Sequence, residues 1–370
     1  MDTKIIAMYL PQYHEIPENN DFWGKGFTDW VGVKRAEPLY KGHRQPNVPL
    51  NENYYDLSDQ NHIRWQAELA NRYGVYGFGI YHYWFSSEKQ LLTKPAEIIL
   101  HDRSINIPFL FAWDNISWRR TWSKMKGNAW SPLQDEEKKR QGPELLVEYK
   151  LGDEEEWKKH FEYLLPYFRD KRYIKTGNKP VFLIYHYDEN IFRMEKYWNE
   201  LAKSKGFDGV EIIYRYDAAR KMEPGHSAFL YEPIYSGWGS VTRRAYERVV
   251  NTVCEKIQTE RKLRVYAYER VWEKIIKNAK KHKAMYSGAF VTYDDTPRRG
   301  RRGVVVEGAK DEKFSSYMKK LIEITNKKKK RFIFLTAWNE WGEGAYLEPD
   351  EANGYAYLEA LKRAIDSCSE

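Results

Sequence analysis

The sequence predicts an α/β fold, a single (β/α)8 TIM barrel with elaborated loops after its strands. Eight short runs of apolar, β-branched and aromatic residues alternate with stretches of helical periodicity, which is typical of buried parallel strands joined by helices. The length of 370 residues leaves room for eight such units. Because the chain contains no linker rich in Gly, Ser or Pro, we expect residues 1–370 to form one domain.

The expected strands are near-continuous apolar runs, as parallel strands covered on both faces should be. They occupy residues 4–10, 75–84, 108–113, 180–187, 210–216, 227–233, 288–294 and 331–338. The same alternation is also compatible with a doubly wound sheet, which is the alternative arrangement.

The expected helices lie between these strands and after the last one. They occupy residues 59–73, 94–101, 154–170, 191–205, 242–256, 314–326 and 352–367. The acidic residues at 153–156 favour a helix start and Gly206 favours a helix end. The long polar stretch 115–152 predicts an extended loop after the third strand, and no element is predicted for the weakly patterned residues 257–286.

The composition excludes several classes of protein. A chain with 16% aromatic residues can bury enough apolar surface to fold, and no apolar run is long enough to span a membrane. Pro11 and Gln12 interrupt the first apolar run where a signal sequence would continue, so we expect a cytoplasmic protein. Two distant cysteines predict neither a disulfide framework nor a zinc site.

The chain also lacks the usual marks of a nucleotide, metal or nucleic-acid site. No phosphate-binding P-loop is present, and no G-x-G-x-x-G follows a strand, so we expect no cofactor. His82 and His186 each stand alone among aromatic residues, whereas a metal site needs several ligands at defined spacing. The net charge of +8 is modest and forms no basic stripe, so we expect no nucleic-acid partner.

Aromatic and polar side chains gather where the expected strands end. In a (β/α)8 barrel the carboxyl ends of all strands meet at one face, which carries the active site. Sugars offer C–H faces to Trp and Tyr rings and hydroxyls to polar groups, so this composition favours a saccharide ligand; alternatively, some of the tryptophans pack loops against the rim. The candidate binding residues are Tyr9, Gln12, His14, Trp23, Trp30, His82, Tyr83, Trp84, Trp113, Asp114, Trp118, His186, Glu232, Trp238, Asp294, Arg298, Trp338, Asn339 and Trp341.

The segment TAWNEWGEG at 336–344 carries the candidate catalytic residues, Glu340 and Glu343. Cleavage of a glycosidic bond typically needs two carboxyl groups, one protonated and one ionised. A neighbouring like charge and a flanking tryptophan can raise the pKa of one carboxyl enough for both states to coexist. Gly342 and Gly344 permit backbone angles that could aim both side chains into one pocket. Alternatively, both glutamates begin a surface helix.

A basic loop, DDTPRRGRRG at 294–303, follows the seventh expected strand. Barrels often bind phosphate at the loops after strands seven and eight, and arginine suits bidentate contacts with anions. The arginines at 298, 299, 301 and 302 could hold a phosphate, a diphosphate leaving group or a uronic acid. The alternative is a solvated basic loop.

Four blocks of sequence resemble the WbsX-like proteins of polysaccharide and O-antigen loci, which are related to glycoside hydrolase family 99. These blocks read YLPQYHEIPENNDFWGKGFTDW at 9–30, YGFGIYHYWF at 76–85, DDTPRRGRRG at 294–303 and AWNEWGEGAYLEPD at 337–350. The resemblance runs over nearly the whole chain. It implies a (β/α)8 barrel that acts on glycosidic bonds.

The family 99 hydrolases carry paired acids in an Asn-Glu-Trp-x-Glu motif, which matches residues 339–343. The resemblance implies that Glu340 is the base toward the sugar 2-hydroxyl, giving a 1,2-anhydro intermediate. It implies that Glu343 protonates the leaving oxygen and then activates water, with retention, on α-mannosides. One block departs from the family: Asp114 and Ile116 stand where the family reads alanine and glutamate, so a substrate contact is lost or moved.

The sequence therefore predicts a retaining glycoside hydrolase acting on a bacterial polysaccharide or glycan, which could be anionic. One alternative is a glycosyltransferase of O-antigen or capsular polysaccharide biosynthesis, with the arginine loop gripping a diphosphate donor. The other is a glycan-binding protein without catalytic activity.

Overall fold

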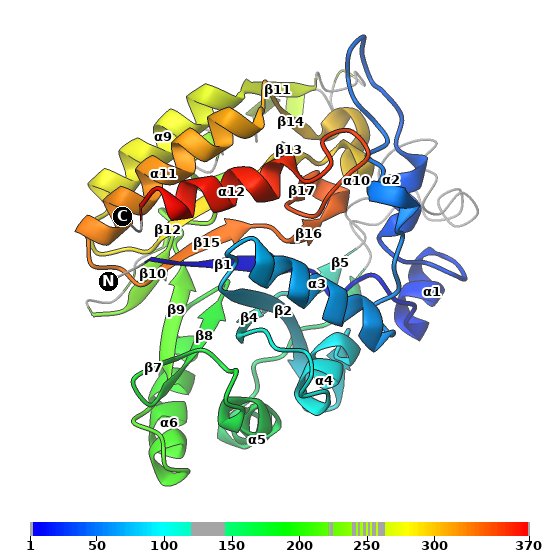
Figure 1. Cartoon of the computed structure of the whole chain (residues 1–370). Helices are drawn as coiled ribbons and strands as arrows, with labels where there is room; N and C mark the ends of the chain where they lie inside the picture. The colour runs from blue at the N-terminus through cyan, green and yellow to red at the C-terminus, as the bar shows by residue number, and fades with distance from the viewer. Residues whose placement is uncertain are drawn as a thin grey trace.

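The computed structural model describes residues 3–119, 145–220, 222, 225–238, 242, 245–246, 249–250, 252–253, 257 and 263–368. Its centre is a run of eight parallel strands in the spatial order β10, β9, β8, β4, β2, β1, β15 and β12 (Figure 1). The strands are β1 (Lys4–Tyr9), β2 (Gly77–Ser86), β4 (Phe109–Trp113), β8 (Lys179–Ile184), β9 (Glu211–Arg215), β10 (Ser227–Phe229), β12 (Ser287–Phe290) and β15 (Phe332–Thr336). Each corresponds to one of the eight strands expected from the sequence.

The two ends of this sheet meet and nearly close it into a barrel. Beyond β10, the Leu230 N–H donates to the carbonyl of Tyr286 at 3.1 Å, and the Tyr286 N–H donates to the carbonyl of Ala228 at 2.8 Å. These bonds join the strand at one edge to the strand at the other. The prediction of a (β/α)8 barrel is therefore confirmed over a doubly wound sheet.

Helices pack around the outside of the strands and at one end of the barrel. They are α1 (Pro17–Trp23), α2 (Trp30–Arg35), α3 (Gln60–Arg72), α4 (Lys94–His101), α5 (Glu154–Arg169), α6 (Glu189–Ser204), α7 (Ile234–Gly237), α9 (Tyr268–Lys281), α10 (Thr296–Arg299), α11 (Asp311–Lys327) and α12 (Ala356–Asp366). The short helices α2 and α10 are the ones at the end of the barrel. Asp153 begins α5 by accepting the N–H groups of Glu155 and Glu156, as its acidic start predicted. Figure 1 shows α9, α11 and α12 side by side on one flank.

Several elements differ from the sequence-based expectation. Helix α9 and a small sheet of β11 (Arg264–Ala267), β14 (Val304–Glu307) and β13 (Tyr293–Asp294) were not predicted. The helix expected over 242–256 falls largely outside the described residues. In the stretch 115–152, where a long loop was expected, β5 (Trp118–Arg119) pairs with β6 (Leu145–Val147), and residues 120–144 lie outside the described part.

Short secondary elements complete the loops. They are the 3-10 turns η1 (Leu50–Glu52), η2 (Gly300–Arg302) and η3 (Trp341–Glu343), and the strands β3 (Lys89–Leu91), β7 (Lys175–Thr176), β16 (Asn339–Glu340) and β17 (Ala345–Tyr346). The β16–η3–β17 hairpin lies against α2 and α10 at one end of the barrel (Figure 1). Among the described helices, none is long and apolar enough to cross a lipid bilayer.

Candidate active site

The guanidinium of Arg298 binds three carboxylates where the β16–η3–β17 hairpin meets α2 and α10. Its Nη2 lies 3.0 Å from Oδ2 of Asp29 and 2.9 Å from Oε2 of Glu340. Its Nη1 lies 2.9 Å from Oε1 of Glu343. Helix α10 supplies the arginine, the residue before α2 supplies the aspartate, and the hairpin after β15 supplies both glutamates. One cation therefore joins the two candidate catalytic glutamates, and the planar fork of arginine suits such multiple contacts.

Burial is the main influence on which carboxyl groups of this cluster carry a proton. Burial raises the pKa of the Glu340 carboxyl to about 8; Arg298 lowers this pKa, while the charges of Glu343 and Asp29 raise it. Three ionised carboxylates would place three negative charges around one positive charge. Coupled carboxyls in such a site share protons, so we expect the cluster to keep one proton near neutral pH. The arrangement can thus offer one protonated and one ionised carboxyl together.

The hairpin that carries the glutamates is held by the chain that follows β1. The side-chain Oδ1 of Asn339 accepts the Leu10 N–H at 2.7 Å, and its Nδ2 donates to the Leu10 carbonyl at 3.0 Å. The Tyr13 hydroxyl donates to the carbonyl of Asn339 at 2.6 Å and accepts the N–H of Trp341 at 3.1 Å. Because these bonds fix the backbone on both sides of Glu340, the first and last strands together set the direction of its side chain.

Two glycines let the hairpin approach the cluster closely. A Cβ at Gly342 would lie 2.5 Å from Nε of Arg298 and 2.6 Å from Oδ2 of Asp29, so a side chain there would push the ion cluster apart. Gly344 has a φ of +55°, a left-handed conformation that favours glycine. Of the two glycines expected to adopt unusual backbone angles, only Gly344 has a positive φ, whereas Gly342 is required by the close approach of Arg298 and Asp29.

Buried tyrosines lie beside the carboxylates. The hydroxyls of Tyr81 and Tyr231 are 2.9 Å apart, and the ring of Tyr185 lies 5.7 Å and 5.4 Å from the rings of these two residues. The guanidinium of Arg215 lies over the rings of Tyr185 and Tyr231. Burial, and then the charges of Glu343 and Glu340, raise the pKa of Tyr231. Ring faces, neutral hydroxyls and carboxyls in one place are groups that can contact a sugar.

Six candidate binding residues lie in or against this cluster. Besides Arg298 and Asn339, they are Trp341, Trp30, Tyr83 and Asp114. The rings of Trp30 and Trp341 are 5.5 Å apart. Burial raises the pKa of Asp114 to about 6, Arg215 lowers it and the charge of Glu343 raises it. Asp114, one of the two residues that depart from the family pattern, therefore lies close enough to Glu343 to feel its charge.

Three other candidates point away from the cluster. Residues along a strand alternate between its faces, and in β2 His82 and Trp84 face α5. The Nε2 atoms of His82 and His160 are 2.8 Å apart, and the ring of Trp84 stacks on His160 at 4.3 Å. Trp113 also packs on His160, with ring centroids 4.7 Å apart. These three side chains form core contacts outside the barrel, so they are not part of the proposed site.

Four further candidates have clear structural contacts. The Tyr9 hydroxyl donates to Gln66 on α3, and Trp338 is fully buried against Phe78. Glu232 accepts the N–H of Ser236 in α7. Asp294 accepts hydrogen bonds from Gln45 and Thr296.

The six remaining candidates are buried or half-buried and have contacts of other kinds. Gln12 and His14 are buried after β1, and Trp23 is half-buried on α1 against Phe27. Trp118 packs on Tyr83, and Trp238 packs on Tyr293. His186 is half-buried, and its backbone N–H donates to the side chain of Asn115.

Several residues in the cluster or beside it were not among the candidates predicted from the sequence. They are Tyr13, Asp29, Tyr81, Tyr185, Arg215, Tyr231 and Tyr293. Strand alternation was the available signal, because it places Tyr81 and Tyr83 of β2 on the face opposite His82 and Trp84. Asp29 carried no such signal, since only the fold brings it to Arg298.

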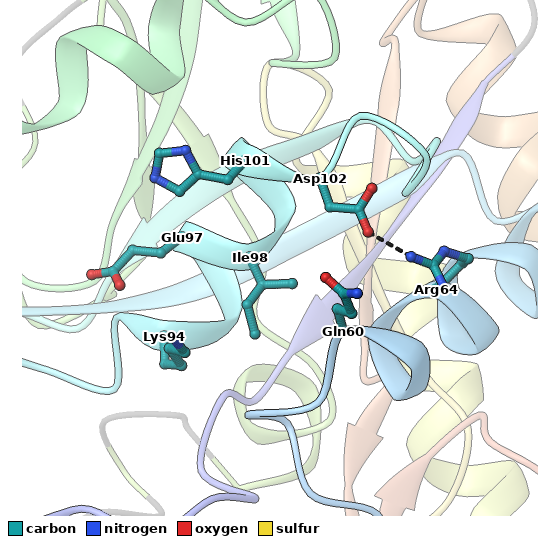
Figure 2. A pocket seen from close by; sticks show the side chains of 7 residues that line it. All are labelled: Gln60, Arg64, Lys94, Glu97, Ile98, His101 and Asp102. Atoms are coloured by element: carbon teal, nitrogen blue, oxygen red, sulfur yellow. Dashed lines mark hydrogen bonds and ion pairs between the residues drawn. The ribbon is translucent and has the colours of Figure 1, made fainter.

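Two pockets differ in how they relate to this cluster: the first contains no residue of the cluster, and the second contains Trp341. One, of about 480 Å³, lies between α3 and α4, where Arg64 pairs with Asp102 at 2.6 Å (Figure 2). The other, of about 490 Å³, is lined by η1, by α3 and by the loop after β17, and it includes Trp341 and Glu348. Among the described residues, no group of three His, Cys, Asp or Glu side chains is arranged to hold a metal ion.

Solved structures with a similar fold include glycoside hydrolases. The GH99 endo-alpha-mannosidase from Bacteroides thetaiotaomicron matches with a TM-score of 0.54 and 13% identity, covering 100% of this chain and 98% of that chain. A glycoside hydrolase-like protein matches with a TM-score of 0.56 and 12% identity, covering 98% of this chain and 94% of that chain. At these identities the likeness concerns the barrel fold.

The sequence itself has relatives of greater length. WxcX, an uncharacterized protein of Xanthomonas campestris pv. campestris (strain B100), is 29% identical over 373 residues, which cover 99% of this chain and 50% of that protein. The chain thus spans about half the length of the curated relatives it matches. The model of the family described as Glycosyltransferase WbsX matches residues 5–361, and the chain therefore belongs to the WbsX family.

Proposed function

We propose that this protein is a retaining glycoside hydrolase that cleaves a bacterial polysaccharide or glycan, with Glu340 and Glu343 as its paired acids. The observation that carries the proposal is the contact of both carboxyls with one guanidinium, each at 2.9 Å from Arg298. Glycosidic cleavage needs such a pair with one proton between them. The barrel fold, which is shared with GH99 enzymes, adds support.

The proposed mechanism uses the two carboxyls in turn. In the reacting complex the single proton shared by the coupled pair lies on Glu343. Glu340 is then ionised and takes the proton of the sugar 2-hydroxyl, and that oxygen attacks the anomeric carbon as the glycosidic bond breaks. Glu343 gives its proton to the leaving oxygen. A water molecule then loses a proton to Glu343 and opens the 1,2-anhydro sugar, and Glu340 returns the proton to the 2-oxygen. The side chain of Glu343 is 17% exposed and that of Glu340 6%, which suits the role of Glu343 toward water.

The family description favours a glycosyltransferase as the second candidate. In that case the arginine loop would bind a diphosphate donor. However, Arg298 is bound to three carboxylates, and Nε of Arg299 pairs with Asp295 at 3.1 Å. Arg298 and Arg299 at least are therefore already paired with anions. This supports hydrolysis over transfer from a diphosphate sugar.

The test is the release of reducing ends from a panel of bacterial polysaccharides and α-mannans. We expect Glu343→Gln and Glu340→Gln each to abolish release. The control Glu351→Gln, which changes an exposed carboxylate in the loop after β17, should keep it. Proton NMR of the first product would show retention. Calorimetric titration with nucleotide sugars tests the second candidate. Tight binding of a donor together with no hydrolysis would favour the transferase.

A further inference from the structure

Glu348 is a buried carboxylate without a cation. The residue is 4% exposed, and it forms no ion pair with any Lys, Arg or His of the described residues. Burying an unpaired charge is costly, and burial raises the pKa of Glu348 to about 7. The mechanism proposed above does not use this carboxyl. A group that is costly to bury and has no assigned role calls for a physical explanation.

Neutral donors from three parts of the fold converge on this carboxylate. Its Oε2 accepts the indole N–H of Trp341 at 2.7 Å and the hydroxyl of Tyr55 at 2.8 Å. Its Oε1 accepts the side-chain amide of Gln66, on α3, at 2.6 Å. Gln66 in turn accepts the hydroxyl of Tyr9, at the end of β1, at 2.7 Å. The carboxylate thereby ties the hairpin to the wall of the barrel.

Trp341 directly follows Glu340 and, with Gly342, separates the two candidate catalytic glutamates. Its backbone N–H is bound by Tyr13 and its indole N–H by Glu348, and its ring stacks on Tyr346 of β17 at 3.7 Å. The residue is 1% exposed. A tryptophan fixed at backbone, ring and indole N–H leaves little freedom to the hairpin residues 340–343. Loss of one fixed point would let the hairpin turn relative to Arg298.

We propose that Glu348 is a positioning residue, which acts through the indole of Trp341 to hold Glu340 and Glu343 at the distances that catalysis needs. The role of these two glutamates rests on the function proposed above, whereas the positioning itself does not. A misplacement of about 1 Å can cost on the order of 100-fold in rate, so a group without contact to substrate can control turnover.

The second pocket explains how this carboxyl meets solvent. Glu348 and Trp341 are part of its lining, together with Tyr55 and His62. The other charged side chain that lines this pocket is Glu52. Water in the pocket can therefore reach the edge of the Glu348 network without passing the candidate catalytic carboxyls.

The first test needs no substrate. Crystal structures of the full chain with Glu348→Gln and Glu348→Ala are compared with the parent and with Glu351→Gln as the control. We expect the alanine variant to move the indole of Trp341 and to lengthen at least one contact of Glu340 or Glu343 with Arg298 by about 1 Å. We expect the glutamine variant to move less, because its amide oxygen can still accept the indole N–H. Unchanged contacts with Arg298 in the alanine variant would overturn the proposal.

The second test uses a substrate found by the reducing-end assay. We expect kcat to fall about 100-fold for Glu348→Ala and about 10-fold for Glu348→Gln, with KM within twofold of the parent. Thermal unfolding gives the folded fraction, to which each rate is normalised. A merely structural role would lower the melting temperature and leave the normalised kcat unchanged, and that result would overturn the proposal.

A double-mutant cycle shows whether Glu348 acts through Trp341. Trp341→Phe removes the indole N–H, so adding Glu348→Gln to it should cost little more than Trp341→Phe alone. Fully additive losses would contradict action through the indole. If the parent hydrolyses nothing, the proposed function fails, and the crystal structures still decide whether Glu348 positions the hairpin.

Discussion

The guanidinium of Arg298 and the carboxyl of Glu340 meet at 2.9 Å with both side chains buried. The same guanidinium holds Asp29, which lies 269 residues earlier in the chain. A buried charge that loses one partner leaves the others uncompensated. The geometry of the candidate catalytic pair therefore depends on Asp29, which need not touch the substrate. It also depends on Gly342, which leaves room for the contact between Asp29 and Arg298.

Replacement of Arg298 by lysine should therefore disable the site. A single ammonium group cannot make the parallel contacts of the guanidinium fork, so Glu340 and Glu343 lose their shared partner. We expect kcat/KM to fall at least 100-fold for Arg298→Lys in the reducing-end assay. Arg302→Lys, which changes an exposed residue of the same loop, should stay within twofold. Equal activities for the two variants would contradict the proposed role of the cluster.

Gly342→Ala should have a similar effect without removing any polar group. The added Cβ would lie 2.5 Å from Arg298 and 2.6 Å from Asp29, well inside contact distance. We expect a folded protein whose activity is reduced at least tenfold. Gly237→Ala is the matched control, because the nearest atom to its Cβ would be Val271 Cγ1 at 3.9 Å. Full activity of Gly342→Ala, measured beside this control, would show that the ion cluster tolerates displacement.

All eight strands of the barrel were predictable because their apolar runs are continuous, and burial on both faces of a parallel strand demands such runs. Helix α9 was not predicted, although Tyr268, Trp272 and Ile275 are fully buried along one face of it. Its buried positions 268, 271, 272, 275 and 279 recur every three or four residues, as on one face of an amphipathic helix, so the sequence carried a signal for α9 that was missed.

The candidate site was predictable in part. Glu340 and Glu343 follow a strand directly, and this local pattern was sufficient to mark them. Trp84 and Trp113 stand at the ends of the expected strands as well, yet they pack on His160 outside the barrel. A residue at a strand end faces either the barrel mouth or the helices, and register decides which. Asp29 could not be inferred, because nothing local in the sequence relates it to Arg298.

The rate of hydrolysis should fall as the pH rises through about 8. Burial raises the pKa of Glu340 from its usual value near 4.5 to about 8, so the cluster keeps its last proton up to that pH. Above it both carboxyls are ionised and no acid remains to protonate the leaving oxygen. A profile of kcat/KM between pH 6 and 10 checks this; a rate that still rises at pH 9 would contradict it.

The same raised pKa has a consequence for stability. The folded protein holds a proton that the unfolded chain releases near pH 4.5, so this group contributes stability at low pH that is lost as the pH rises toward 8. Glu340→Gln cannot lose such a proton. We expect its melting temperature to exceed that of the parent by more at pH 9 than at pH 5. Thermal unfolding at both values measures the gap, and Glu351→Gln serves as the control.

The buried pair His82 and His160 should make the protein acid-sensitive. Burial lowers the pKa of His82 to about 3, and burial together with the charge of His82 lowers that of His160. Their contribution to stability is therefore present above the unfolded pKa of about 6.5 and is lost as the pH falls toward 3. Each proton taken up on unfolding costs about 1.4 kcal/mol of stability per pH unit in this window.

His160→Gln removes one of these protons while its amide can still bond to Nε2 of His82. The variant loses the stacking on Trp84 and should be less stable than the parent at pH 7. Because its stability falls less steeply with acid, the difference in unfolding free energy should shrink between pH 6.5 and pH 4. Urea unfolding at several pH values measures it, with His101→Gln, an exposed residue of α4, as the control. A difference that stays constant with pH would mean that His160 already carries its charge in the folded protein.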